Sequence, residues 1–314
     1  MPVVLSRRVE LVRLVMHRRK RLEDACQRAG WVQSRTLQCL GFDWSILTND
    51  PALVDEITYL YQACVVSDRG TARHVFILRS HSSSDTPSVS LYRGGRAILR
   101  RAPAGLAIAR VVWEVNRGVV EDAQNQLLLH AAAAERDGRV VLLAGPEGSG
   151  KSTLVAALVR SGLRYVTDET VAVDLPRVTI TPYPKPIALD PGSLESLGDV
   201  SAAVPPALAI GLDQQLVPAQ AFRRDAVAKP GGVASLLVLP AYRPGLATFA
   251  QSISRAEAAI ALAEQAFNFQ ALGPGRLDVI ADVVRSCDCY RLEMGDLGTA
   301  SRLVIDLERA VSIR

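Results

Sequence analysis

One short segment of this 314-residue chain has a spacing that is typical of phosphate binding. Residues 145–152 read GPEGSGKS, in which a glycine is followed five residues later by Gly-Lys-Ser. In this pattern the glycines let backbone N–H groups curl around phosphate oxygens, the lysine reaches the β- and γ-phosphates, and the serine hydroxyl reaches Mg²⁺. The spacing therefore predicts a site for ATP and Mg²⁺. The expected contacts are Gly145, Pro146, Glu147, Gly148, Ser149, Gly150, Lys151, Ser152 and Thr153.

The residues on either side of this segment indicate a strand before it and a helix after it. Residues 140–144 form a short apolar run of the kind found in buried strands, and residues 152–161 have helical periodicity. Gly162 follows at a position where helices commonly stop. A loop between a strand and a helix N-terminus brings the partial positive charge of the helix to the bound phosphates.

Two acidic residues end the next apolar run. Residues 164–169 read RYVTDE, a short strand pattern that closes on Asp168 and Glu169. Because this strand follows the predicted helix directly, we expect it to be parallel and adjacent to the strand that precedes the glycine-rich segment. Ligands bind at the carboxyl ends of such strands. One acid could then hold Mg²⁺ together with Ser152, and the other could take a proton from an acceptor hydroxyl.

These motifs together resemble the catalytic core of the HPr kinase/phosphorylase family. The resemblance runs from Leu-His at 129–130, through the glycine-rich segment, to Thr-Asp-Glu at 167–169. It implies an α/β fold with a P-loop kinase core of the HPr kinase / phosphoenolpyruvate carboxykinase type and a smaller N-terminal α+β lobe.

The same resemblance implies roles for individual residues. The family's acidic pair serves as catalytic base and metal contact, so Asp168 is expected to be the base and Glu169 to be the catalytic residue that contacts the metal. His130 stands 15 residues before Gly145, a spacing like that of the family's histidine, and should orient Asp168 or contact the transferring group.

Further along the chain, residues 182–186 (PYPKP), 290–292 (YRL) and 295–297 (GDL) look like elements of the shorter HPr-kinase-like proteins. Some of those relatives accompany peptide natural-product pathways and phosphorylate a hydroxyl on a peptide. Lys185 lies in the proline-stiffened segment after the acidic pair, where we expect it to neutralise phosphate charge in the transition state.

The chain departs from the family pattern in three respects. Ala131 replaces the glycine that follows the histidine, Glu169 replaces a second aspartate, and the segment that grips the HPr protein has no counterpart here. The resemblance therefore does not extend to HPr as a substrate or to the reverse, phosphorylase reaction.

The length and the apolar content of the chain favour a two-lobe protein. With 314 residues, of which 49% are hydrophobic, it exceeds a typical single domain. We expect a basic N-terminal helical extension at residues 1–40, an α+β lobe at residues 41–126, and a P-loop catalytic domain at residues 127–314.

Local patterns predict the elements of both lobes. In the first lobe we expect strands at 44–48, 75–78, 88–92 and 97–100, with helices at 51–64 and 105–126. In the second lobe we expect a flap at 205–230, strands at 234–239 and 290–293, and helices at 254–266, 277–285 and 297–311, the last of them capped by Asp296.

Composition narrows the class of protein further. Five scattered cysteines argue against a disulfide framework and favour a reducing, cytoplasmic location, and Cys287 and Cys289 have the two-residue period of a strand. No apolar run is long enough to span a membrane. Residues 1–35 hold nine of the 36 basic residues and three of the 32 acidic ones. A solvated terminal helix is the favoured interpretation of this cluster, which makes nucleic acid an unlikely partner.

The sequence thus predicts an ATP-dependent kinase that moves the γ-phosphoryl group to a hydroxyl, with a Ser or Thr of a peptide or protein as the favoured acceptor. One alternative is a kinase for a small-metabolite hydroxyl, because nothing in the motifs reads a peptide. Another is a non-catalytic, nucleotide-sensing interaction protein. Relatives in the family form oligomers, which favours a homo-oligomer here.

Overall fold

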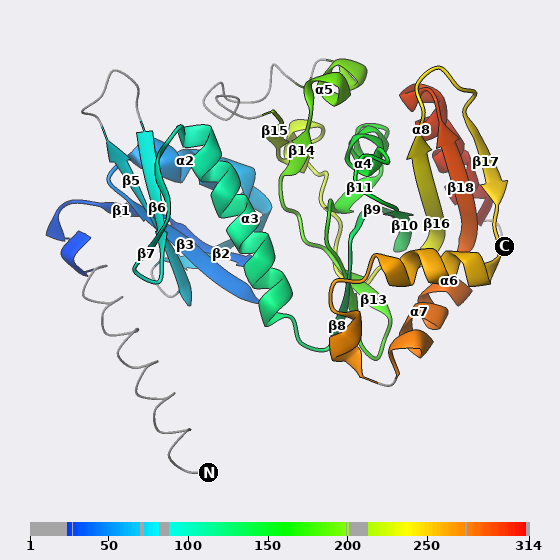
Figure 1. The fold of residues 1–314 in the computed structure, drawn as a ribbon, viewed down its shortest axis with the longest axis horizontal. Coiled ribbons are helices and arrows are strands. Elements are labelled where there is room, and N and C mark those ends of the chain that lie inside the picture. The colour runs from blue at the N-terminus through cyan, green and yellow to red at the C-terminus, as the bar shows by residue number, and fades with distance from the viewer. Residues whose placement is uncertain are drawn as a thin grey trace, which may run out of the picture. The chain divides into compact units, whose positions relative to one another are not determined.

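The computed structural model describes residues 24–26, 28–69, 72–81, 88–198, 200, 213–273 and 275–311. Contacts divide the chain into two compact units, and the division falls after Val115. It lies inside the long helix α3 (Ala104–Asp122). Most of the first unit precedes this point and most of the second follows it (Figure 1).

The first unit is built on one seven-stranded sheet. Its order is β4-β2-β3-β5-β6-β7, with β1 paired to β3. The strands are β1 (Val32–Gln33), β2 (Arg35–Cys39), β3 (Phe42–Thr48), β4 (Val65–Arg69), β5 (His74–His81), β6 (Ser88–Arg93) and β7 (Arg96–Ala102). The helical elements are α2 (Pro51–Leu60), the 3-10 helix η1 (Gln62–Cys64) and the first part of α3.

Two details of the first unit differ from expectation. Strands β1 and β2 lie inside the range 1–40 for which a helical extension was expected, because they pair with β3 and β4. The basic run at residues 18–21 lies outside the described residues. Helix α3 ends at Asp122, and Gln126, expected to be helical, instead begins a strand of the second unit.

The second unit is a mixed α/β structure with three sheets. A six-stranded sheet has the order β11-β9-β10-β16-β18-β17, a three-stranded sheet the order β13-β12-β8, and β14 pairs with β15. The large sheet consists of β9 (Ala131–Arg136), β10 (Arg139–Ala144), β11 (Arg164–Thr167), β16 (Val233–Tyr242), β17 (Phe249–Ser252) and β18 (Asp288–Met294). The smaller sheets consist of β8 (Gln126–Leu129), β12 (Val171–Asp174), β13 (Thr179–Thr181), β14 (Ile187–Leu189) and β15 (Gln215–Val217).

The helices of this unit are α4 (Lys151–Arg160), α5 (Pro191–Leu197), α6 (Arg255–Glu264), α7 (Arg276–Arg285) and α8 (Leu297–Val311), with short 3-10 turns η4 (Ala219–Ala221) and η5 (Phe269–Leu272). The side chains of Asp190, Ser254 and Asp296 accept hydrogen bonds from backbone N–H groups in the first turns of α5, α6 and α8. Such caps satisfy N–H groups that have no partner within the helix. The predicted cap of α8 by Asp296 is confirmed.

The strand β9 corrects one prediction about the sheet. β11 was expected to be adjacent to β10, but β9 lies between them and is antiparallel to both. The reason is the tight turn at Asp137 and Gly138, where φ is 52° and 80°. Positive φ at both positions is what a two-residue hairpin turn requires, so β9 folds directly back onto β10. β11 still runs in the direction of β10, one strand further away.

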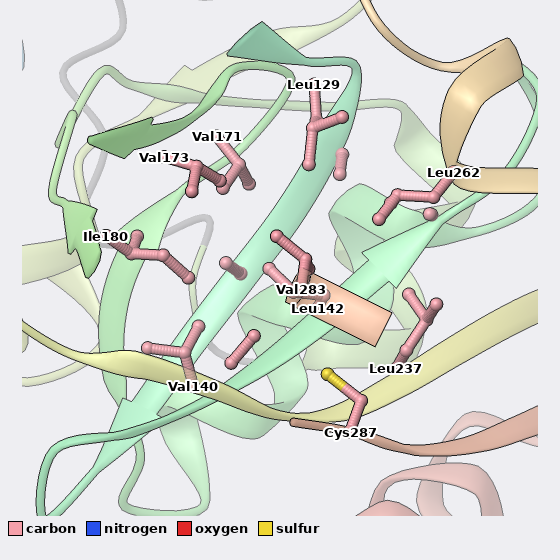
Figure 2. Packing of buried hydrophobic residues seen from close by; sticks show 14 of the residues in the cluster. Leu129, Val140, Leu142, Val171, Val173, Ile180, Leu237, Leu262, Val283 and Cys287 are labelled. Carbon is pink, nitrogen blue, oxygen red and sulfur yellow. The ribbon is translucent and has the colours of Figure 1, made fainter. Parts of the chain in front are cut away.

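Alternating residues of the large sheet face two different layers. Ala131, Ala133 and Leu142 belong to a buried cluster that also contains residues of the three-stranded sheet and of α6 and α7 (Figure 2). Helices α4 and α8 contact each other, and α4 packs against β9. Since successive strand residues point to opposite faces, Ala132 and Ala134 face α4. The apolar faces of the sheet are thus covered by different helices.

Helix α8 is also fixed to the β9–β10 hairpin by charge. Glu308 is 1% exposed, and its two carboxylate oxygens accept hydrogen bonds from Arg136 Nη1 at 2.8 Å and from Arg139 Nη2 at 3.2 Å. The two arginines flank the Asp137-Gly138 turn. This cluster therefore ties the C-terminal helix to the turn end of the hairpin.

The remaining expectations concern cysteines, the flap and membrane spans. All five cysteines are buried, and Cys289 lies in β18, with Cys287 directly before the strand, as the two-residue period predicted. Residues 205–212 of the expected flap lie outside the described residues, while 215–217 form β15. Within the described part of the chain, no helix has both the length and the apolar character to cross a bilayer.

Candidate functional site

The topology of the large sheet gathers the predicted residues at one edge. β10, β16 and β18 are mutually parallel, and β11 runs the same way across the antiparallel β9. The residue that precedes β9 and the residues that follow the other strands therefore lie at the same edge. In sheet order this edge carries Asp168 and Glu169 after β11, His130 before β9, the segment 145–150 after β10, and the carboxyl ends of β16 and β18.

The glycine-rich segment forms a tight loop at the start of α4. Gly150 precedes the helix with φ = 90°, a left-handed conformation that residues other than glycine adopt at a cost. A Cβ atom on Gly150 would lie 2.4 Å from Met294 Cε. The backbone conformation therefore favours glycine here, and any larger residue would also displace the end of the Met294 side chain.

The side chain of Lys151 is hydrogen-bonded to the backbone of the loop that precedes it. Its Nζ donates hydrogen bonds to the carbonyl oxygens of Gly145 at 2.7 Å and Pro146 at 2.8 Å, and the residue is 7% exposed. Burial lowers the pKa of Lys151 from its ordinary value, although the charges of Asp168, Glu147 and Glu169 oppose this change. The ammonium group is thus held inside the loop and close to three carboxylates.

Ser149 adds a second polar group to the inside of the loop. It is 7% exposed, and its Oγ atom is buried without a hydrogen-bond partner among the described residues. A buried hydroxyl without a partner is unfavourable unless a ligand or water completes it. This atom indicates that the loop is shaped to receive an external acceptor such as a phosphate oxygen.

Asp168 joins the acidic edge to the loop. Ser152 Oγ donates a hydrogen bond to Asp168 Oδ1 at 3.0 Å, and Asp168 is 3% exposed. Burial raises the pKa of Asp168, whereas the charge of Lys185 and the hydrogen bond from Ser152 oppose the rise. The carboxylate is therefore a better proton acceptor than an exposed aspartate would be.

Glu169 and Lys185 form an ion pair beside Asp168. Lys185 is 3% exposed, and its Nζ donates to Glu169 Oε2. Burial alone would raise the pKa of Glu169, but the charge and the hydrogen bond of Lys185 outweigh burial, so that this pKa lies below its ordinary value. Tyr165 Oη, also buried, donates to the backbone carbonyl of Lys185 at 2.9 Å and holds its segment against β11. Glu169 has φ = 85°, an unusual backbone conformation outside glycine.

His130 lies between β8 and β9 and belongs to the same group of charges. Its backbone N–H donates to Gln265 O at 2.6 Å, and its ring lies 5.6 Å from the ring of Phe267 between centroids. Burial and then the charge of Lys151 lower the pKa of His130, while Glu169, the Gln265 side chain and Glu147 act in the opposite direction. The imidazole is therefore held mainly neutral near neutral pH.

The other predicted contacts lie around the start of α4. Thr153 Oγ1 shares a hydrogen bond of 2.6 Å with Ser193 Oγ of α5, so it is engaged with the protein rather than turned into the loop. Pro146 contributes a carbonyl to Lys151, and Glu147 is exposed at the loop. Gly148 has φ = 77°, a conformation that the tight turn of the loop requires.

The donor set fits a phosphate chain with a hard cation. The loop offers N–H groups, a lysine and a free hydroxyl, and the acidic edge offers a serine hydroxyl and carboxylate oxygens, which are ligands that Mg²⁺ accepts alongside phosphate oxygens. In the described residues, no group of three or more His, Cys, Asp or Glu side chains has the arrangement of a metal site. Any Mg²⁺ bound here would thus depend on phosphate oxygens for part of its coordination.

Sequence reasoning missed two features of this site. The first is β9, whose signal was present in the Asp-Gly pair at 137–138. The second is the carboxyl end of β16, which continues past the strand expected at 234–239 and ends at Tyr242. No local pattern marks Tyr242 as a neighbour of Gly150, because that proximity depends on the order of strands in the sheet.

Comparison with known proteins identifies no family. No protein-family model matches the chain, and no curated protein matches it by sequence. Among solved structures, the Hpr(Ser) kinase/phosphatase from Coxiella burnetii is similar to 59% of this chain and to 92% of its own length, with 13% sequence identity and a TM-score of 0.31. A likeness at this level adds no argument about function, so the site is interpreted from its own geometry.

Proposed function

We propose that the chain is an ATP-dependent phosphotransferase that moves the γ-phosphoryl group of ATP to a hydroxyl. The observation that carries this proposal is the hydrogen bond between Ser152, in the first turn after the phosphate loop, and the buried Asp168. This contact supports the proposal because, with a triphosphate bound in the loop, the carboxylate would lie beside the last phosphate.

In this proposal the loop holds the phosphates. Backbone N–H groups of residues 147–150 and the positive end of α4 face the phosphate chain, and Ser149 Oγ gains the acceptor that it lacks. Lys151 Nζ exchanges its two carbonyl partners for phosphate oxygens. Mg²⁺ would be held by Ser152 and Glu169 and would neutralise charge on the β- and γ-phosphates.

The acids and Lys185 then act on the acceptor. The acceptor hydroxyl transfers its proton to Asp168 as its oxygen bonds to the γ-phosphorus, and the bond from that phosphorus to the β–γ bridging oxygen breaks, which leaves ADP. The raised pKa of Asp168 suits it to accept this proton. Lys185 fixes Glu169 and offsets negative charge that spreads over the transferring group. His130, mainly neutral, orients the acidic pair.

The acceptor class follows from the family resemblance of the sequence. A Ser or Thr hydroxyl on a peptide or protein is the proposed acceptor, and the first unit is proposed to present it. ATP is the proposed donor because the loop binds the triphosphate tail that all such donors share.

The test is transfer of label from γ-labelled ATP with Mg²⁺ to a panel of Ser- and Thr-containing peptides. Asp168→Asn should reduce the rate of transfer by about 10²- to 10⁴-fold, the usual contribution of a general base. Asp174→Asn is the matched control. Asp174 also accepts side-chain hydrogen bonds in the second unit, from Gln126 and Thr181, but it lies at the end of β12, away from the phosphate loop.

Transfer that survives in Asp168→Asn at the wild-type rate would exclude Asp168 as the base. Consumption of ATP with release of free phosphate, and no labelled peptide at any concentration, would instead identify an ATPase.

A further inference from the structure

We propose that Tyr242 and the turn that follows it at residues 243–248 form the surface on which the base of the bound nucleotide rests. This inference rests on the proposed phosphate site and extends it to the other end of the ligand. It assigns a role to a region of the sheet edge that the phosphoryl-transfer chemistry does not use.

The direction of the ligand follows from the order of strands at the edge. The loop after β10 has the acids of β11 and His130 on one flank, and β16 and β18 on the other. The last phosphate must face Asp168 for transfer to occur. The nucleoside end of a ligand that crosses the loop therefore leaves on the opposite flank, toward the carboxyl ends of β16 and β18.

Tyr242 lies at that flank and in contact with the loop. A Cβ atom on Gly150 would lie 3.4 Å from Tyr242 Cβ, and Pro240 O lies 3.6 Å from the corresponding position on Gly145. Tyr242 pairs with Met294 in the parallel β16–β18 ladder, and Met294 is itself buried against Gly150. Yet Tyr242 is 51% exposed. An aromatic ring is thus held next to the phosphate loop with much of its surface accessible.

The turn after Tyr242 is held firmly against β18. Arg243 N–H donates to Met294 O at 2.9 Å, and Thr248 Oγ1 accepts hydrogen bonds from the N–H groups of Gly295 and Asp296, both at 3.0 Å. A Cβ atom on Gly295 would lie 1.7 Å from Leu246 O, so the turn packs directly on this glycine. Leu246 is 56% exposed. The carboxyl end of β16 and the turn that follows it thus carry two exposed apolar side chains on a backbone that is tied to β18.

The chemistry of this surface suits a planar heteroaromatic ring. Stacking of a nucleobase on an aromatic side chain is tolerant of base identity, because every base offers a π-face. The surface should therefore add affinity for nucleotides over a bare phosphate chain, and should distinguish adenine from guanine only weakly.

The experiment compares ligands with and without a base. Dissociation constants of ATP, ADP and inorganic tripolyphosphate are measured by calorimetry with Mg²⁺ for the wild type, Tyr242→Ala, Tyr242→Phe and Phe249→Ala. Tyr242→Ala should weaken ATP and ADP by about 10-fold or more and leave tripolyphosphate unchanged, while Tyr242→Phe keeps wild-type affinity. Phe249→Ala is the matched control, because Phe249 is also 51% exposed but pairs with Glu293 on the far side of β18.

Each other outcome overturns the inference in a recognisable way. An equal loss for ATP and tripolyphosphate in Tyr242→Ala means that the residue supports the loop and not the base. No change for any ligand removes Tyr242 from the site. If the wild type binds neither tripolyphosphate nor nucleotides, the phosphate site itself is wrong, and the base surface fails with it.

Discussion

A buried carboxylate lies near each end of the β9–β10 hairpin, and the two carboxylates have different hydrogen-bond partners. At the turn end, both oxygens of Glu308 are bonded to arginines, Arg136 and Arg139. At the loop end, the one hydrogen bond to the Asp168 carboxylate from the described residues comes from the neutral hydroxyl of Ser152. Burial raises the pKa of Asp168 above its ordinary value.

On the proposed function, this difference distinguishes a structural carboxylate from a reactive one. A carboxylate with two bonded cations is stabilised as the anion and fixed in place. One that is buried with a neutral donor keeps the capacity to bind a proton or a cation. Burial of a charge alone thus does not identify a functional site; the partners of each oxygen do.

The largest expected effect on stability comes from the turn end. Glu308→Gln should lower the free energy of unfolding by about 2–3 kcal/mol, because it leaves two arginines without their buried partner. Denaturant unfolding monitored by circular dichroism measures this change. Asp168→Asn is the control, and its free energy of unfolding should not fall, because it removes a costly buried charge. A larger loss in Asp168→Asn than in Glu308→Gln would reverse the comparison.

A smaller effect is expected from the ion pair beside Asp168. Lys185→Gln leaves Glu169 without the charge that holds its pKa below its ordinary value, so burial should raise that pKa. The rate of transfer should fall by about 10- to 100-fold, and the acidic limb of the pH–rate profile should move to higher pH. Lys229→Gln, at an exposed position of the same unit, should leave both unchanged. A lower rate with an unshifted acidic limb would mean that Lys185 does not control Glu169.

The smallest effect concerns His130. Its pKa in the folded chain lies below the ordinary value of 6.5, so the unfolded chain binds more protons below that pH. Its contribution to stability is complete above pH 6.5 and is lost as the pH falls toward the folded pKa. His130→Asn should therefore make the melting temperature less dependent on pH below pH 6.5. An unchanged or steeper slope would show that the ring is not held neutral in the fold.

The local parts of the site could be predicted from sequence. The strand, loop and helix around residues 145–152 follow from glycine spacing and apolar periodicity, and the structure contains β10 and α4 at those positions. The structure also brings Asp168, Glu169, His130 and Lys185 into one group of interacting charges. Their catalytic roles remain predictions.

The relations between strands could not be predicted in the same way. The placement of β9 between β10 and β11 depends on a hairpin that competes with the parallel pairing expected for a strand after a crossover helix. Glu308 is hydrogen-bonded to Arg136 and Arg139, which lie about 170 positions earlier in the chain. The local periodicity of a sequence gives no indication of such a contact. The same limit applies to Tyr242, which meets the phosphate loop only because β16 neighbours β10.

Because β9 carries four alanines, the close packing of its backbone sets the distance between Ser152 and Asp168. Residues 131–134 are all alanine, so each side chain is a single methyl group, and all four residues are fully buried between the layers of the unit. Methyl groups packed this closely leave no room for a larger side chain. A bulkier residue at Ala132 or Ala134 should therefore push α4 away from the sheet and move Ser152 away from Asp168. Substitutions at the rims of the sheet edge should, in contrast, change side chains without altering the distance between Ser152 and Asp168.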